Sequence, residues 1–318
     1  MKHNYQPKQE FIDRMNLLLD NKEDVKKFFK TAKTLPKKSI RVNTLKISPE
    51  KLVKILKQKN WQIKQLPNNP EIIQILSQLN PGELGTTIEH ILGYYYSQEI
   101  TSMMPIIALN PKPNEILLDI AAAPGSKTTQ AGALMKNQGT IIANDISMSR
   151  VSILSANLER TGITNTIITR YEGSALIERL KKSKIKPDKI LTDVPCSGEG
   201  NIRISPRTYL EWSEKLLERF SKLQKKLASS ALEILKPEGE MIYSTCTHSP
   251  EENELVIQHL LDNFNITIEE INLPIKSRPG ITRWKNKKFS QELKKCHRIY
   301  HHDNDMEGFF LCKIRKLK

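Results

Sequence analysis

Short apolar runs alternate with amphipathic segments through the second two thirds of the chain. The apolar runs cover residues 115–120, 139–145, 165–173, 187–194 and 239–246, and helical spacing is clearest in residues 207–235. Strands separated by crossover helices predict a parallel sheet with helices on both faces. We therefore expect an α/β domain over residues 111–318, with a sheet of the Rossmann-like kind.

The preceding residues 1–110 have a different pattern. Apolar positions recur at three-to-four spacing in residues 11–32 and 48–61, where Ser48 and Pro49 form a helix start. Residues 39–47 alternate apolar and polar like a strand. This pattern predicts a small α+β N-terminal domain, which ends near Pro111 and Pro113 because prolines punctuate the link.

The distribution of charged residues along the chain suggests a polyanionic partner. The net charge is +15, yet residues 1–110 carry 17 basic and 10 acidic side chains and residues 276–318 carry 13 and 4, so the middle is nearly neutral. Positively charged flanks favour a polyanion such as RNA. A lysine-rich solvated surface is the alternative.

Several classes of protein are excluded by composition. No run approaches the roughly 18 apolar residues of a membrane span, and the N-terminus lacks the apolar stretch of a signal peptide. We expect a cytoplasmic protein without membrane contact. The four cysteines form no CxxC pair, so we expect thiols and no metal site. His301 and His302 are expected to lie on the surface, because adjacent histidines alone do not bind an ion.

Polar side chains follow each predicted strand. They are Asp119, Asp145, Glu172, Asp193 with Cys196, and Cys246. Ligands of such sheets bind outside the carboxyl ends of the strands. A single acidic residue after a strand is often a helix cap, but polar side chains after all five strands favour a ligand-binding or catalytic site.

The segment DIAAAPGSKTT, residues 119–129, suggests the small ligand. It lacks the glycine before Lys127 that a phosphate loop needs, and it lacks GxGxxG. A small-residue turn remains, followed by Asp145 for ribose hydroxyls and Glu172 for an adenine amine. Ribose and adenine without a phosphate clamp indicate S-adenosyl-L-methionine. A tight turn with ordinary capping acids stays an alternative.

Two cysteines follow neighbouring strand candidates, in TDVPCSGEG and YSTCTHSPEEN. Methylation of a base nitrogen would need an Asn/Asp-Pro-Pro-aromatic turn, but the turn here is Asp-Val-Pro-Cys. Carbon 5 of a pyrimidine is a poor nucleophile, so its methylation requires a thiolate to add at carbon 6 first. The adduct must then lose a proton and release the enzyme, and these steps require a second thiol or base.

The segments DIAAAPGSKTTQ, DVPCSGEGNIRISP and YSTCTHSPEENE resemble successive motifs of the Sun/Fmu-type RNA (cytosine-5) methyltransferases. SIRVNTLK, YYSQEITSMM and EGFFLCKIRK extend the resemblance over residues 39–316. It implies that Cys246 is the nucleophile, that Cys196 assists product release, that Asp193 binds the cytosine edge and that Lys127 lies near the reacting centre. The S-adenosyl-L-methionine pocket would be lined by Ala121, Ala122, Ala123, Pro124, Gly125, Ser126, Lys127, Asp145, Arg150, Glu172 and Asp193.

The chain departs from the family pattern at a few positions. Ser126 stands where the family usually has glycine, Glu172 where it has aspartate, and His301 where we expect proline. We predict an enzyme that acts as a monomer on tRNA, with ribosomal RNA as an alternative. Two further hypotheses are an inactive RNA-binding scaffold and a nucleotide hydrolase that uses GSKT as a phosphate loop.

Overall fold

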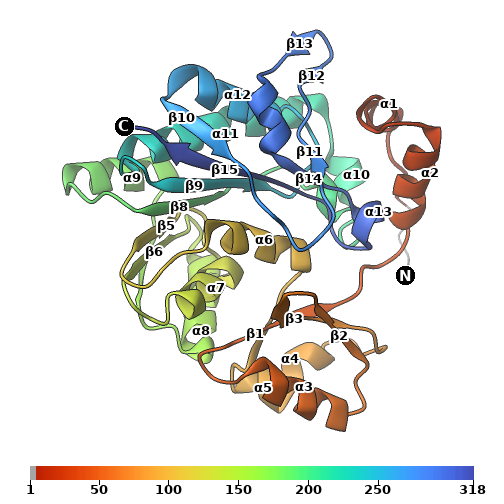
Figure 1. Cartoon of the computed structure of the whole chain (residues 1–318). Coiled ribbons are helices and arrows are strands. Elements are labelled where there is room, and N and C mark those ends of the chain that lie inside the picture. Colours follow the sequence, from red (N-terminus) through yellow and green to blue (C-terminus); the bar gives the residue numbers. More distant parts are fainter. Residues whose placement is uncertain (1–4) are drawn as a thin grey trace.

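The computed structural model describes residues 5–318 (Figure 1). The strands are β1 (Ser39–Val42), β2 (Ile63–Leu66), β3 (Asn69–Ile75), β4 (Tyr95–Ser97), β5 (Ile116–Asp119), β6 (Thr140–Asn144), β7 (Thr166–Thr169), β8 (Lys189–Asp193), β9 (Glu240–Thr245), β10 (Ile266–Glu269), β11 (Arg278–Pro279), β12 (Arg283–Trp284), β13 (Lys287–Lys288), β14 (His297–Ile299) and β15 (Phe309–Lys316). The α-helices are α1 (Gln9–Leu18), α2 (Lys22–Thr31), α3 (Pro49–Gln58), α4 (Glu83–Thr86), α5 (Ile88–Ile91), α6 (Ile100–Leu109), α7 (Ser126–Leu134), α8 (Met148–Thr161), α9 (Gly173–Lys182), α10 (Thr208–Glu211), α11 (Glu214–Ile234), α12 (Glu254–Asn263) and α13 (His301–Asn304). The 3-10 helices are η1 (Glu199–Asn201) and η2 (Gln291–Lys295).

The apolar runs predicted as strands form the middle of the main sheet. They lie in the order β7-β6-β5-β8-β9, and each neighbouring pair is parallel. Antiparallel β15 then joins β9 and is followed by β14 and β11, while β10 also pairs with β15. The predicted α/β sheet is confirmed, and the C-terminal strands extend it.

Helices cover both faces of this sheet (Figure 1). Successive residues of a strand point to opposite faces, so Leu118 and Ile190 pack with the apolar sides of α9, α11 and α12. Leu117 and Leu191 pack with α6, α7 and α8 on the other face. Burial on both faces explains why the central strands are continuously apolar rather than alternating.

A smaller antiparallel sheet in the order β2-β3-β1-β4 forms the α+β part. Its core joins Ile40 and Ile73 to Leu52 and Leu56 of α3. The predicted start of α3 is confirmed, because the Ser48 side chain accepts a hydrogen bond from the Lys51 N–H and Pro49 is in the first turn.

The first two helices lie apart from that small sheet, beside α10 and α13 (Figure 1). Phe11 and Phe28 share an apolar cluster with Trp212 and Tyr300. The small sheet contacts α7 of the α/β part through Arg41 of β1, which donates to the Ser126 carbonyl at 2.7 Å. The N-terminal residues therefore contact the α/β part at two separate places.

Candidate active site

The carboxyl ends of β8 and β9 bring the two cysteines of the predicted site into contact. Cys196 follows β8, Cys246 follows β9, and their sulfur atoms are 3.1 Å apart. The Gly200 N–H donates to the Cys246 carbonyl at 2.9 Å, and the hydroxyls of Ser197 and Thr247 are 2.8 Å apart. Two motifs separated by 50 residues thus form a single thiol pair.

The environments of the two sulfurs differ. Its hydrogen bond with Cys246, together with burial, raises the pKa of the Cys196 thiol well above the usual range. The side-chain amide of Asn201 donates to the sulfur of Cys246 at 3.2 Å. Cys196 therefore keeps its proton at neutral pH, and a thiolate on Cys246 would accept hydrogen bonds from both neighbours.

The turn that carries Cys196 is stabilised by hydrogen bonds to a buried carboxylic acid. Glu252 accepts hydrogen bonds from the Ser197 N–H at 3.0 Å and from the Gln224 side chain at 2.8 Å. Gln224 also donates to the Pro195 carbonyl at 2.9 Å. Burial raises the pKa of Glu252 to about 7. Because α11 supplies Gln224, the longest helix positions the thiol.

Lys127 and Asp193 form an ion pair at the same edge of the sheet. The ammonium of Lys127 lies 2.7 Å from Asp193 and donates to the Ser102 hydroxyl at 2.9 Å. Ser244 donates to the other oxygen of Asp193 at 2.7 Å. Only 10% of the Lys127 side chain and 25% of that of Asp193 are exposed, so the pair is held in place with little solvent around it.

The predicted cofactor turn lies between β5 and α7. Gly125 has φ +102°, a conformation that favours glycine, and an added Cβ would lie 2.9 Å from Leu154. The turn is closed by a hydrogen bond from the Gly125 N–H to the Ala122 carbonyl at 2.8 Å. Arg150 donates to the Ala123 carbonyl, and Asn157 donates to that of Pro124 at 2.9 Å.

Buried acceptors without partners lie beside this turn. Within residues 5–318, Asp119 Oδ1 and Asp145 Oδ2 accept no hydrogen bond, although the Arg150 guanidinium lies 3.3 Å from the latter as an ion pair. Burial raises the pKa of Asp119 to about 7. Orphaned oxygens at the ends of β5 and β6 fit a ligand that brings hydroxyl or N–H donors, as a ribose does.

Glu172 takes a different position from the other predicted cofactor residues. Its exposed carboxylate caps α9 by accepting from the Ala175 N–H at 3.2 Å and the Ser174 hydroxyl at 2.8 Å. These hydrogen bonds lower the pKa of Glu172 against the opposing effect of burial. In this conformation the carboxylate serves the helix N-terminus.

Some residues of the site were not identified from the sequence. Asn201, Ser102 and Ser244 each contact a predicted site residue, and Glu252 accepts from the N–H of Ser197, the residue after Cys196. All four lie inside motifs quoted above, but nothing in their spacing indicates which side chain or amide they contact. Contacts between loops provide that information.

The prediction of surface histidines is wrong. His301 is fully buried and its Nε2 lies 2.9 Å from the Phe28 carbonyl, while His302 lies 2.8 Å from Asp24. Burial lowers the pKa of His301 to about 3. The sequence pattern missed this because α2, more than 270 residues earlier, covers both rings. Among the described residues no group of three or more His, Cys, Asp or Glu could hold a metal ion.

Positive charge is less available in the C-terminal flank than its count suggests. Arg278 pairs with Asp24 at 2.5 Å, Lys313 with Glu240 at 3.2 Å and Arg298 with Glu254. These cations are engaged inside the protein. Over residues 5–318 no helix combines the length and apolar character needed to cross a membrane.

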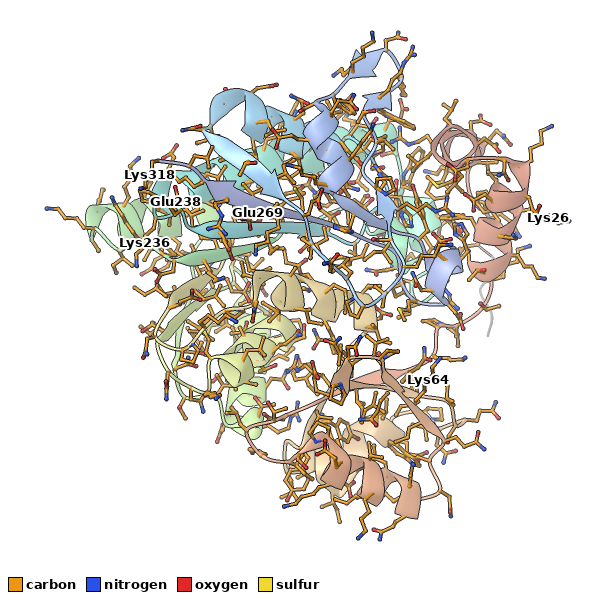
Figure 2. All side chains as sticks on the ribbon, viewed as in Figure 1. Lys26, Lys64, Lys236, Glu238, Glu269 and Lys318 are labelled. Atoms are coloured by element: carbon orange, nitrogen blue, oxygen red, sulfur yellow. The ribbon has the colours of Figure 1, made fainter. Side chains whose placement is uncertain are left out.

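A hollow of about 200 Å³ lies at the amino-terminal end of the parallel strands. Its charged walls pair with one another, as Lys236 does with Asp188 at 2.5 Å and Lys189 with Glu240 at 2.6 Å. Figure 2 labels Lys236 and Glu238 at this end of the sheet. The chemistry-bearing groups therefore gather at the opposite edge.

We expect Gly200→Ala to destabilise the protein. An added Cβ would lie 2.1 Å from the Gly308 carbonyl oxygen and 3.0 Å from that of Cys246, so two backbones must separate. The expected loss is about 1–3 kcal/mol, measured by urea unfolding. Gly85→Ala is the control, because nothing lies within 4 Å of its added Cβ. Equal stability of the two variants would contradict the predicted clash.

A second variant tests the buried carboxyl of Glu307, which is 3% exposed. Neither of its carboxylate oxygens has a hydrogen-bond partner among the described residues. Burial and the negative charge of the nearby Glu99 raise the pKa of Glu307 from 4.5 to about 8, although the positive charge of Arg203 lowers it in part. Between these values the unfolded chain binds fewer protons than the folded one, so stability falls as pH rises.

Glu307→Gln removes this pH-dependent loss of stability. The unfolding free energy of the variant, minus that of the wild type, should therefore increase by roughly 3–5 kcal/mol between pH 5 and pH 9. Urea unfolding across that range measures the difference. Glu218→Gln, at an exposed position, is the control and should show no such trend. A constant difference for Glu307→Gln would contradict the assigned pKa.

Comparison with known proteins identifies the family. A family model described as 16S rRNA methyltransferase RsmB/F matches residues 106–315, and one for the N-terminal domain of 16S rRNA methyltransferase RsmF matches residues 8–100. The chain is similar to a tRNA (cytosine(49)-C(5))-methyltransferase of Pyrococcus abyssi, with 39% identity over 97% of this chain and 96% of that protein. It is also similar to ribosomal RNA small subunit methyltransferase F of Vibrio parahaemolyticus, with 37% identity over 96% of this chain but 62% of that protein.

Solved structures agree with this result. A methyltransferase homologue from Pyrococcus horikoshii has a TM-score of 0.81 at 34% identity and covers 98% of this chain and 100% of its own. NSun6 from the same organism, solved with SFG, has a TM-score of 0.84 at 26% identity and covers 98% of each chain. The resemblance of the sequence motifs is thereby confirmed, and the chain belongs to the RsmB/F family of S-adenosyl-L-methionine-dependent RNA cytosine-5 methyltransferases.

Proposed function

We propose that this chain methylates carbon 5 of cytosine in tRNA through a covalent cysteine adduct. The observation that carries the proposal is the contact of two sulfurs, 3.1 Å apart, at neighbouring strand ends. The Lys127–Asp193 ion pair beside them adds a donor and an acceptor suited to the edge of a base.

In the proposed reaction the thiolate of Cys246 bonds to carbon 6 of cytosine and moves the ring electrons onto carbon 5. Asp193 accepts from the exocyclic amine and favours the ring protonated at N3, which makes carbon 6 more electrophilic. Carbon 5 forms the bond to the methyl group. It then loses its proton to a base, and the electrons of that C–H bond restore the double bond and expel Cys246. Cys196 assists this last step.

The cofactor would be held by Ala121, Ala122, Ala123, Pro124, Gly125, Ser126, Lys127, Asp145, Arg150, Glu172 and Asp193. S-adenosyl-L-methionine supplies a methyl group activated by its sulfonium charge. Asp145 has a buried acceptor oxygen suited to a ribose hydroxyl, which supports this assignment. Glu172 would have to leave the N-terminus of α9 to reach an adenine amine.

The choice of tRNA follows the tRNA-named relative, which is 39% identical over 97% of this chain and 96% of its own length. The ribosomal relatives have a similar identity of 37–40%, so ribosomal RNA is the alternative substrate that the experiment must include. We propose that residues 1–110 contact RNA, that residues 111–318 catalyse the reaction, and that the enzyme acts as a monomer in the cytoplasm.

The test is transfer of labelled methyl groups from S-adenosyl-L-methionine to unmodified tRNA and to 16S ribosomal RNA transcripts, followed by bisulfite mapping. We expect 5-methylcytosine in tRNA. Labelling of ribosomal RNA alone would overturn the substrate, and a methyl group on nitrogen would overturn the reaction. A thermal shift with S-adenosylhomocysteine but not with ATP is expected, and the reverse would support a nucleotide hydrolase.

A further inference from the structure

A groove of about 400 Å³ opens beside the active site, and the predicted catalytic residues do not line it. One wall is formed by residues 35–39, which run from the link after α2 into the start of β1. The other is formed by Gly82, Leu84 and Gly85 at the start of α4 and by residues 97–99 at the end of β4. Ile204 closes one side. The volume lies within the range of roughly 300–1,000 Å³ that small-molecule sites occupy.

The walls combine exposed apolar side chains with cations. Leu35 is 78% exposed and Ile204 is 61% exposed. Lys37 and Lys38 are exposed on the same wall, and Lys37 has only a 4.0 Å ion pair with Asp305. Single-stranded nucleic-acid sites combine apolar faces, between which a base can lie, with positively charged groups that bind its phosphate.

Two chains of contacts connect this groove with the nucleophile. Ile204 donates its N–H to the carbonyl of Asn201, whose side chain reaches the sulfur of Cys246. On the other side, Glu99 in the groove accepts from the Glu307 N–H, at 3.3 Å. The next residue, Gly308, donates to the carbonyl of Gly200, whose own N–H is bonded to the Cys246 carbonyl. Short chains of contacts therefore link the walls of the groove to Cys246.

We propose that this groove holds the RNA nucleotide next to the target cytosine, with its base between Leu35 and Ile204 and its phosphate at Lys37 and Lys38. The inference rests on the proposed function for the identity of the RNA. A target base that leaves its stack to reach Cys246 takes its backbone neighbours with it, and the adjoining groove receives one of them. Binding there offsets part of the unstacking cost.

Binding is tested first without methyl transfer. The probe is a fluorescent octamer of uridine, measured by anisotropy with the full chain. Leu35→Ala/Ile204→Ala and Lys37→Ala/Lys38→Ala should each weaken binding about fivefold or more, and the lysine pair should reduce the salt slope by about 1–2. Matched controls outside residues 1–110 are Ile153→Ala/Ile167→Ala, which are 51% and 57% exposed, and the exposed pair Lys182→Ala/Lys186→Ala. Groove variants that bind like the controls would overturn the inference.

Position is tested by crosslinking. Single-cytosine RNAs carry 4-thiouridine immediately 5′ or 3′ of that cytosine, and crosslinked peptides are identified by mass spectrometry. One of the two RNAs should label residues 35–38 or Ile204, and labelling only elsewhere by both would overturn the assignment. If wild-type enzyme binds RNA through the groove but transfers no methyl group to cytosine, the proposed function is contradicted and the groove assignment stands. If the groove binds a peptide and no RNA, both proposals are contradicted.

Discussion

Cys246→Ala should abolish methyl transfer and leave no covalent complex with RNA, whereas Cys196→Ala should accumulate one. Without a thiolate at carbon 6, carbon 5 has too little electron density to take a methyl group, so a loss of at least about 10⁴-fold is expected. Without Cys196, the adduct still forms because Asn201 contacts the sulfur of Cys246 independently. Its release is slowed, because the protonated thiol 3.1 Å away is missing.

The measurement is a denaturing gel of enzyme incubated with labelled tRNA and S-adenosyl-L-methionine, next to methyl incorporation. Cys312→Ala is the matched control, since Cys312 is a fully buried core thiol in β15 and should leave both readouts close to wild type. An adduct from Cys246→Ala, but not from Cys196→Ala, would reverse the two roles. Normal turnover in both variants would contradict covalent catalysis.

Asp193→Asn should lower kcat by about 10²–10⁴-fold, the range associated with a positioned acid–base group. The change removes the carboxylate that would bind the cytosine edge and leaves Lys127, with only 10% of its side chain exposed, without its ion-pair partner. The second effect costs folding stability as well. Kinetics and thermal unfolding must therefore be measured on the same variant.

The double variant Asp193→Asn/Lys127→Met separates these effects. Removing both charges should restore most of the thermal stability lost in Asp193→Asn, because no unpaired buried cation remains. Activity should stay as low as in the single variant. Recovery of activity together with stability would mean that Asp193 acts by holding Lys127 and has no direct part in binding cytosine.

The five parallel strands of the main sheet and the candidate residues at their ends were predictable from the sequence alone. Strand runs such as 187–194 are apolar because both faces are buried, and this local property is visible in one dimension. The start of α3 at Ser48 and Pro49 is equally local. Asp193, Cys196 and Cys246 were found from their place after strands and from motif resemblance.

Which of these groups meet, and what surrounds them, depends on the packing of segments that are far apart in the chain. This packing brought Asn201 to Cys246, left Glu172 as a helix cap and buried His301 under α2. It also placed Leu35 and Ile204 on one groove, although 169 residues separate Leu35 from Ile204. The physical reason is that periodicity reports burial along a segment, whereas a hydrogen bond or a groove depends on how distant segments pack together.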